Sequence, residues 1–540
     1  MVSFAFPIPL LAVLVVGLVL SRVPHVMLDA DGEPHRLVVA LYWLGALALV
    51  ALHAGTWPLN EDEIFWLTSS WAAQHGEMPG TLPMRHLPFR PLLTLGLPPS
   101  QTIILSRIVL CSVALLCGLV MARLARRMGC RVTVASFAGA STFLALGTLA
   151  GMIIPRAEYL ACAAFTLGLS FLLAPPRRWP RACSTVAALT FITLAAATSM
   201  RHLVFPLAAI VVAVLASDPA RRAKALLWSA LGMALALAPT IGYIMATDSW
   251  AAVYQTNVTD VVQAGWVDAA APASFPLLLM IAAAAGIALG WRKTNRPLAV
   301  TALTVMWMAA TAAQLLNPQK MNYTLGPWLV VSLALAVVAI EDLLSGEAGP
   351  ARNRWVALSL AIVGLSAFGK PQELLRGPAL AGDVRQLVSQ LHLVDWLGEV
   401  AGAGPVMCVT PYHPIRVANA WPVWNAWVYC GVASPALSQR LNADLETNLS
   451  SGRPTVIAWD PVRRSRLPNV LCYATDKGGI PLDRMPALAA RLAAHYRLVE
   501  WAQPLPPEIS GGRFLIRRDV PLDNRVTPLN DDTILHWQDE

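Results

Sequence analysis

Three consecutive acidic residues follow an apolar run that is long enough to cross a bilayer. Glu61, Asp62 and Glu63 stand in the stretch WPLNEDEIFWLTSSWAAQHG, at residues 57–76. Asn60 and Glu63 have the spacing of a capping box, and acidic residues in a first helical turn complement the helix dipole. The stretch therefore predicts a short helix that holds carboxylates at the membrane surface. These acids could be caps and nothing more, or one of them could act as a general base.

Several short connectors farther along the chain carry cations that suit a phosphate group. The candidates are Arg90, Arg156 beside the acid Glu158, Arg201, His202, and Lys320 near Tyr323. Arginine can bind a phosphate with two parallel hydrogen bonds, whereas lysine acts as a point charge. An alternative for the Arg201–His202 pair is that both side chains simply extend to the lipid headgroups.

The elements that must position these residues are transmembrane helices. The chain of 540 residues is 56% hydrophobic and only 13% charged, which is typical of a membrane protein. Apolar runs recur up to residue 368, and helices of this kind cross a hydrocarbon core about 30 Å thick. We count about twelve, near 4–22, 37–54, 101–122, 132–152, 157–174, 183–199, 202–217, 226–247, 273–290, 298–316, 327–345 and 355–368.

Basic clusters between alternate runs predict the orientation. They are RLARRMGCR, PPRRWPR, DPARRAK, WRKTNR and ARNRW. The positive-inside rule places all of them in the cytoplasm, and these anchors explain most of the net charge of +8 without nucleic-acid binding. The remaining connectors, including the loop 55–100 and every candidate residue above, then face the exterior or periplasm. We expect a multi-pass protein of the cytoplasmic, or inner, membrane.

The composition shifts after residue 368, which predicts two domains, a transmembrane domain at 1–368 and an extracytoplasmic domain at 369–540. In the second domain GPVMCVTPYHP, RPTVIAWDP and GRFLIRRDV indicate strands, whereas RMPALAARLAAHYRLVEW has a helical period. Alternating strands and helices favour a small α/β fold. It contains neither a glycine-rich phosphate loop nor a nucleophile elbow, so nothing marks it as a separate enzyme.

The order of features at 60–130 resembles the start of the membrane glycosyltransferases with a GT-C fold. The closest likeness is to the protein O-mannosyltransferase and lipid A aminoarabinose transferase group, through DEIFWLTSSWAAQHG, FRPLL, LSR and RLARRMG. The family's Lys-Pro-Pro-Leu-like turn has Arg90 in place of lysine here and one proline fewer. More distant likenesses follow in IIPRAEYLACAAFTLGLSFLL, QKMNYTLGPWLVVSLALAVV and VMCVTPYHPI.

The resemblance implies inverting transfer of a sugar from a polyprenyl-phosphate donor to a glycan, lipid or protein acceptor at the outer face of the membrane. Asp62 would be the general base, and Glu63 would orient either Asp62 or the acceptor. Glu158 would be a second acid that binds the sugar or raises the pKa of Asp62. The donor would be bound by Arg90, Arg156, Arg201, His202, Lys320 and Tyr323. No cofactor is implied; outward carboxylates could hold a divalent cation, but no ligand spacing indicates a metal site.

Three alternatives remain open at the level of sequence. A twelve-span secondary transporter fits the number of apolar runs, although transporters usually carry their polar signals within the spans. A polymerase or ligase of lipid-linked glycans would also use polyprenyl carriers, but such proteins concentrate polar residues in a large late loop. A membrane scaffold without catalytic activity is the third alternative, and an assay for turnover separates it from the others.

Overall fold

The computed structural model describes most of the helical body and parts of the tail, at residues 28, 34–57, 59, 63, 67, 70, 89–149, 156–198, 202–254, 277–292, 297–316, 325–346, 350–367, 377–401, 406–408, 420–421, 455–458, 486–502 and 513–529. Its contacts divide the chain into two units. The bundle unit comprises Met1–Gly55, Ile108–Tyr243 and Ala270–Leu375, and the loop-tail unit comprises Thr56–Arg107, Ile244–Ala269 and Arg376–Glu540. The segment Thr56–Arg107 therefore clusters with the tail, and the predicted domain boundary at 368 stays a prediction.

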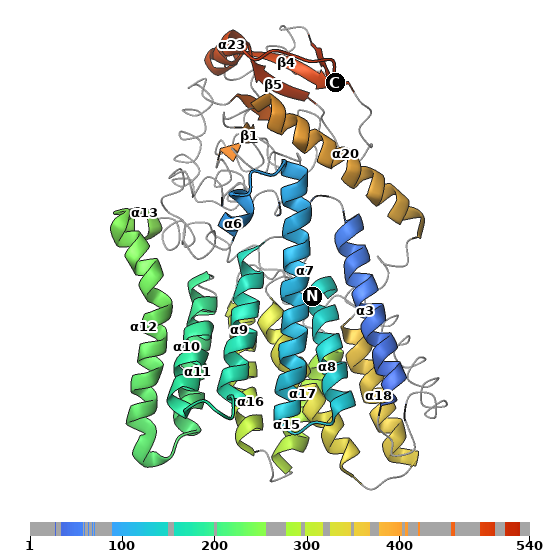
Figure 1. Cartoon of the computed structure of the whole chain (residues 1–540), viewed down its shortest axis with the longest axis vertical. Coiled ribbons are helices and arrows are strands. Elements are labelled where there is room, and N and C mark those ends of the chain that lie inside the picture. The colour runs from blue at the N-terminus through green and yellow to red at the C-terminus, as the bar shows by residue number, and fades with distance from the viewer. Residues whose placement is uncertain are drawn as a thin grey trace. The chain divides into compact units, whose positions relative to one another are not determined.

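Long apolar helices make up the bundle unit, and Figure 1 draws them as roughly parallel rods. They are α3 (Arg36–Thr56), α7 (Pro99–Arg127), α8 (Val132–Leu144) with the π-helical η2 (Ala145–Leu149), α9 (Ala157–Leu173), α10 (Arg181–Thr198), α11 (Val204–Leu215), η4 (Pro219–Arg221), α12 (Arg222–Ala246), α15 (Leu277–Arg292), α16 (Pro297–Leu316), α17 (Gly326–Leu344) and α18 (Pro350–Ser366). Both α7 and α12 extend from this unit into the loop-tail unit.

These helices agree with the apolar runs of the sequence. Each predicted run from 37–54 onward overlaps one helix of the bundle unit, whereas the run 4–22 lies outside the described residues. Within the described part of the chain, six helices are long and apolar enough to cross a membrane, and four more apolar helices are shorter. The chain is thus a multi-pass membrane protein, and a total of about twelve spans stays a prediction.

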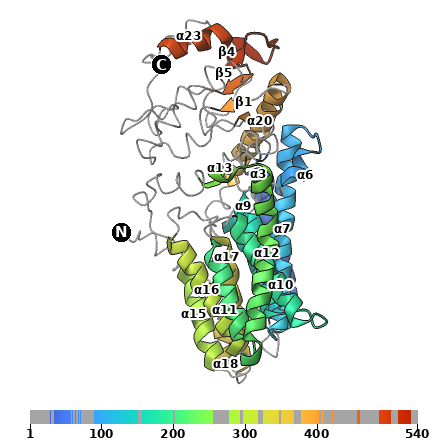
Figure 2. The same cartoon turned by 90° about the vertical axis from the view of Figure 1, so that its left-hand side faces the viewer.

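Helix α17 is the most enclosed helix of the bundle unit. Its apolar segment is 89% buried inside the protein, because α8, α9, α15, α16 and α18 all pack on it. Figure 2 shows α15 and α16 beside it. Close packing relies on small residues, as expected where lipid gives no hydrophobic drive between helices. A Cβ added at Gly286 of α15 would lie 2.0 Å from the carbonyl oxygen of Leu335, so only glycine allows this approach.

The described part of the loop-tail unit contains a mixed sheet, one long helix and three shorter ones. The helices are α6 (Arg90–Leu93), α13 (Trp250–Tyr254), α20 (Gly377–Ala401) and α23 (Pro486–His495), and the strands are β1 (Val406–Cys408), β2 (Ala420–Trp421), β3 (Val456–Ala458), β4 (Tyr496–Trp501), β5 (Arg513–Arg517) and β6 (Val526–Pro528). The strand order is β2-β1-β3-β5-β4-β6. Strand β1 runs parallel to β2 and β3, and the pairs β3–β5, β4–β5 and β4–β6 are antiparallel.

The predicted strands at 404–414, 453–461 and 512–520 are confirmed by β1, β3 and β5. The helical prediction for 484–501 is wrong in its second half, because α23 ends at His495 and β4 begins at once. Residues 496–501 include valine and aromatic side chains, which suit a strand. Pairing with β5 on one side and β6 on the other decides the conformation.

Helix α20 covers the sheet and was not predicted from the sequence. Leu393 and Trp396 are fully buried in a core with residues of β4, β5 and β6. The ring of Trp396 lies 4.8 Å from that of Trp501 and 5.3 Å from that of Phe514, measured between centroids. Aromatic pairs at these separations stabilise a core beyond their buried area. The helix and the sheet therefore form one packed body.

Candidate active site

Glu63 lies on the inward face of the first-loop helix. The residues of this helix that the structure describes are Glu63, Leu67 and Ser70, and each of the three is fully buried. Their spacing of four and three residues places them on one side of a helix. Asp62 and Glu61 lie outside the described residues.

A buried arginine from the start of α7 binds Glu63 through both carboxylate oxygens. Arg107 Nε donates to Oε1 at 2.8 Å and Nη2 donates to Oε2 at 2.7 Å, and the side chains are only 4% and 0% exposed. The remaining guanidinium nitrogen, Nη1, donates to the carbonyl oxygen of Trp57 at 2.8 Å. Two parallel bonds fix the orientation of both groups, so Arg107 holds the loop both before and within its helix.

Two further hydrogen bonds connect this loop to α20. Gln390 Oε1 accepts from the backbone N–H of Leu59 at 2.7 Å, and Asp395 Oδ1 accepts from the backbone N–H of Ser100 at 2.9 Å. All of these residues belong to the loop-tail unit. Sequence reasoning noted Arg107 within the motif LSR without assigning it a role, and no local signal in the sequence marked Gln390 or Asp395.

Arg156 and Glu158 lie at the start of α9 in the bundle unit. Arg156 has extended backbone at the N-cap position, and Glu158 is in the first turn. Both are buried, at 7% and 9% exposure. A carboxylate in the first turn is favoured by the helix dipole. The structure thus brings the predicted acid and the predicted arginine to the same helix end.

Residues Lys320 and Tyr323 precede α17 and lie outside the described residues, but the start of α17 is placed. A Cβ added at Gly326 would lie 2.9 Å from Sγ of Cys162. Since Cys162 is in the second turn of α9, the first turn of α17 lies beside the start of α9. The connector with Lys320 and Tyr323 therefore enters α17 at the end of the bundle unit that carries Arg156.

His202 is buried at the start of α11, with 3% exposure. Its ring lies 5.2 Å from that of Phe205 at an angle of 22°, and Phe205 in turn contacts Phe165 of α9, 4.7 Å away. The side chain of His202 therefore does not extend to lipid headgroups, which corrects that alternative for this residue. Arg201 lies outside the described residues.

Short connectors join α9 to α10 and α10 to α11, so α9 and α11 begin at the same end of the bundle unit. Arg156, Glu158 and His202 therefore share this end. Arg90 is an exposed residue of α6 and belongs, with Glu63, to the other unit.

The opposite end of the bundle unit is basic, and its arginines bind the carbonyl groups at helix C-termini. Arg127 donates to Ala174 O, and Arg181 donates to Ala216 O. Cations at helix C-termini are favoured by the dipole. These connectors are among those predicted to be cytoplasmic, and among the described residues they lie at the end of the bundle unit opposite to Arg156, Glu158 and His202.

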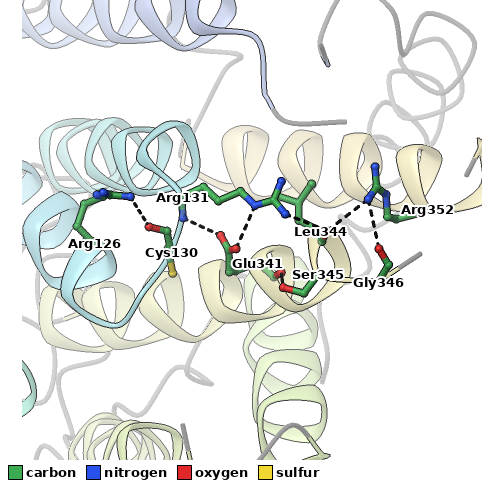
Figure 3. A network of polar contacts seen from close by, with 8 residues as sticks. All are labelled: Arg126, Cys130, Arg131, Glu341, Leu344, Ser345, Gly346 and Arg352. Carbon is green, nitrogen blue, oxygen red and sulfur yellow. Dashed lines mark hydrogen bonds and ion pairs between the residues drawn. The ribbon is translucent and has the colours of Figure 1, made fainter. Parts of the chain in front are cut away.

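Figure 3 shows a network of polar contacts around the C-terminus of α17. Glu341 Oε2 accepts from the backbone N–H of Arg131 at 2.8 Å, and Oε1 lies 3.4 Å from Nε of Arg131. Arg126 Nη1 donates to Cys130 O at 2.8 Å, and Arg352 Nη1 donates to Leu344 O at 3.4 Å. This network joins α7, α8, α17 and α18 at one end of the bundle unit.

Among the described residues, no group of three or more His, Cys, Asp or Glu side chains is arranged to hold a metal ion. The two buried acids among the predicted site residues, Glu63 and Glu158, belong to different units.

No family model matches the sequence. No curated protein matches it either. Among solved structures, ArnT from Cupriavidus metallidurans bound to undecaprenyl phosphate is 15% identical with a TM-score of 0.45, and the alignment covers 70% of this chain and 85% of ArnT. The oligosaccharyltransferase of Archaeoglobus fulgidus is 10% identical with a TM-score of 0.43, covering 93% of this chain and 77% of that protein.

Proposed function

We propose that this protein is an inverting glycosyltransferase that moves a sugar from a polyprenyl-phosphate donor to a glycan, lipid or protein acceptor at the outer face of the cytoplasmic membrane. The observation that carries the proposal is the buried, two-bonded pair of Glu63 and Arg107. It fixes the helix that follows Asp62, within the sequence block that resembles GT-C enzymes. An N-cap alone needs no such buried partner.

In this proposal the two acids of the first loop have different roles. Both oxygens of Glu63 are bonded to Arg107, so Glu63 positions the helix rather than accepting a proton from the acceptor. Asp62 is the general base, because it directly precedes the fixed residue Glu63 in the sequence block that resembles these enzymes. A base held in position contributes about 10²–10⁴ to the rate.

The departing polyprenyl phosphate gains negative charge in the transition state and needs cations near it. Arg156 and His202 share one end of the bundle unit with the connector that carries Lys320 and Tyr323, and we assign these residues to the phosphate and its sugar. Arg90 and Arg201 complete the set, and Glu158 is assigned to the sugar. A phosphodiester at the interface suits both the fork of arginine and the point charge of lysine.

Sugar transfer in membranes from cells that express the chain tests the function. We would supply a radiolabelled pool of polyprenyl-phosphate sugars and compare wild type with Asp62→Asn at matched expression. We expect incorporation into the acceptor fraction to fall at least about a hundredfold in the variant. Glu61→Gln is the matched control, because it removes the neighbouring acid and should leave transfer close to wild type.

Two results would contradict the proposal in different ways. Equal transfer by wild type and Asp62→Asn would mean that the acid pair is only a helix cap. No transfer by the wild type from any donor in the pool would favour the transporter, for which uptake into vesicles is the direct measurement.

A further inference from the structure

We infer that helix α20 is a positioning element for the candidate active site, and that Gln390 and Asp395 fix the two ends of the first outward loop. The C-terminal domain would then be required for catalysis although it carries no catalytic motif of its own. This inference rests on the proposed glycosyltransferase function.

The first contact holds the segment that leads into the acid pair. The backbone N–H of Leu59 donates to Gln390 Oε1 at 2.7 Å, and Gln390 is only 6% exposed. The neighbouring carbonyl of Trp57 accepts from Arg107, and Glu63 is bonded to the same arginine. Trp57, Leu59 and Glu63 are therefore each hydrogen-bonded to Arg107 or Gln390. A buried N–H that loses its acceptor is costly, so Gln390 cannot be replaced by an apolar residue without a change in this segment.

The second contact holds the start of α7. The first amide groups of a helix have no partner within it, and Asp395 Oδ1 accepts from one of them, the N–H of Ser100, at 2.9 Å. Close packing supports the bond, because a Cβ added at Gly398 would lie only 3.0 Å from Cγ of Pro99. Arg107 follows Ser100 by two helical turns. Asp395 thereby sets the position of the arginine that binds Glu63.

The opposite side of α20 is embedded in the sheet core. Leu393 and Trp396 are fully buried against residues of β4, β5 and β6, including Trp501 and Phe514. The same helix thus joins the sheet to both ends of the loop. Because packed interiors transmit small shifts rather than absorb them, a displacement of the sheet would move the loop that carries Asp62 and Glu63.

Two variants of the full chain in lipid nanodiscs test this inference. Asp395→Ala removes the acceptor for Ser100 N–H, and Gln390→Met removes the acceptor for Leu59 N–H at nearly constant volume. We expect each to lower kcat for sugar transfer about tenfold to a hundredfold, with a smaller change in the KM for the donor, because misplacement of a catalytic group by about 1 Å has effects of this size. Hydrogen exchange should rise at residues 57–63 and at the first turns of α7.

Matched controls separate positioning from general damage. Asp395→Asn keeps an oxygen acceptor at the same place and should restore most of the activity lost in Asp395→Ala. His392→Ala changes an exposed residue of the same helix and should alter neither transfer nor exchange. If Asp395→Ala also raises hydrogen exchange in β4 and β5, the substitution has loosened the sheet itself. The result for Gln390→Met then decides whether α20 positions the loop.

Unchanged transfer and unchanged exchange in both variants would overturn the inference. The same holds if Asp395→Asn is as inactive as Asp395→Ala, because the hydrogen bond would then not be what matters. A wild type that transfers no sugar would contradict the proposed function instead, and the exchange measurements would still show whether α20 holds the loop.

Discussion

Two arginine–glutamate pairs, one in each unit, use the same chemistry in different surroundings. The Arg107–Glu63 side chains are 4% and 0% exposed and share two bonds of 2.7–2.8 Å. In the other pair Arg131 is 32% exposed and its Nε lies 3.4 Å from Glu341, whose shorter bond is to the backbone of Arg131. The first pair depends on its two side chains, whereas the second is largely a carboxylate that caps a helix. The difference indicates that the first pair has a positional role that the second does not need.

Loss of the buried arginine should have the largest effect. Arg107→Ala leaves the carboxylate of Glu63 buried without its partner, and breaking such a pair costs about 3–5 kcal/mol. We expect a clear fall in the melting temperature of the full chain in detergent and loss of sugar transfer. Both are measured on the same preparation, by intrinsic fluorescence and by label incorporation.

The conservative variant sharpens this prediction. Arg107→Lys keeps the charge but not the two-bonded geometry, so stability should recover more than transfer does. If Arg107→Lys were as active as wild type, the orientation of Glu63 would not matter for transfer. The Arg107–Glu63 pair would then have no positional role that distinguishes it from the Arg131–Glu341 pair.

The capping carboxylate of the bundle unit should come second. Glu341→Ala removes the acceptor for the N–H of Arg131 at the start of α8, and an unsatisfied buried donor costs about 1–3 kcal/mol. We expect a smaller fall in melting temperature than for Arg107→Ala. Glu341→Gln retains an acceptor and is the control. Sugar transfer per folded molecule should be unchanged, since Glu341 lies at the end of the bundle unit opposite to Arg156.

Loss of Arg131, the arginine of the second pair, should lower the melting temperature less than Arg107→Ala or Glu341→Ala does. Arg131→Ala leaves the backbone bond to Glu341 in place and removes only a side chain that is about one-third exposed. Partly exposed ion pairs contribute about 1 kcal/mol or less. The melting temperature should therefore stay near that of wild type, and raised salt should reduce what difference there is. A loss as large as that of Arg107→Ala would show that the two pairs are equivalent after all.

The sequence predicted those features that have local signals. Apolar runs locate α3, the helices from α7 to α12 and the helices from α15 to α18, because a membrane-spanning helix needs a continuous apolar segment. Basic clusters identify one end of the bundle unit for the same local reason. In contrast, the sequence does not predict β4, because its apolar residues continue the helical pattern of the preceding segment. Its strand conformation depends on pairing with β5 and β6, which are distant in the sequence.

The candidate site was predicted in part for the same reason. Asp62, Glu63, Arg156 and Glu158 stand in short motifs, so the chemistry of their side chains could be interpreted directly from the sequence. The partners of the loop could not be found this way. Leu59 and Gln390 are 331 positions apart, and Ser100 and Asp395 are 295 apart. No pattern in one sequence connects residues at such separations, since only the folded tail brings α20 to the loop.

A third arginine, Arg525 of the tail, extends the comparison to ion pairs in which both side chains are exposed to solvent. Its Nη2 donates to Asp523 and to Glu399, at 2.6 Å in each case, and the side chains of Arg525, Asp523 and Glu399 are 35%, 36% and 61% exposed. The hydrogen bond from the Arg525 guanidinium lowers the pKa of Asp523 below its ordinary value. Stabilisation from a lowered pKa is complete above the pKa of the unfolded chain and is lost as the pH falls through the folded value.

Asp523→Asn should therefore have the smallest effect, and one that depends on pH. The variant keeps one oxygen to accept the backbone N–H of Arg525. It loses the charge and the second oxygen, which accepts from the guanidinium group of Arg525. Exposed pairs of this kind contribute about 1 kcal/mol or less. At neutral pH we expect slightly faster hydrogen exchange at residues 513–529 of the variant, corrected for intrinsic rates. The difference should begin to shrink below about pH 4, where the carboxyl group of the unfolded chain is protonated, and should vanish once the pH is below the lowered pKa of Asp523 in the folded protein. A difference that stays constant from neutral to acidic pH would mean that Asp523 stabilises the tail by its shape, and that the contrast among the three arginines is not one of charge and burial.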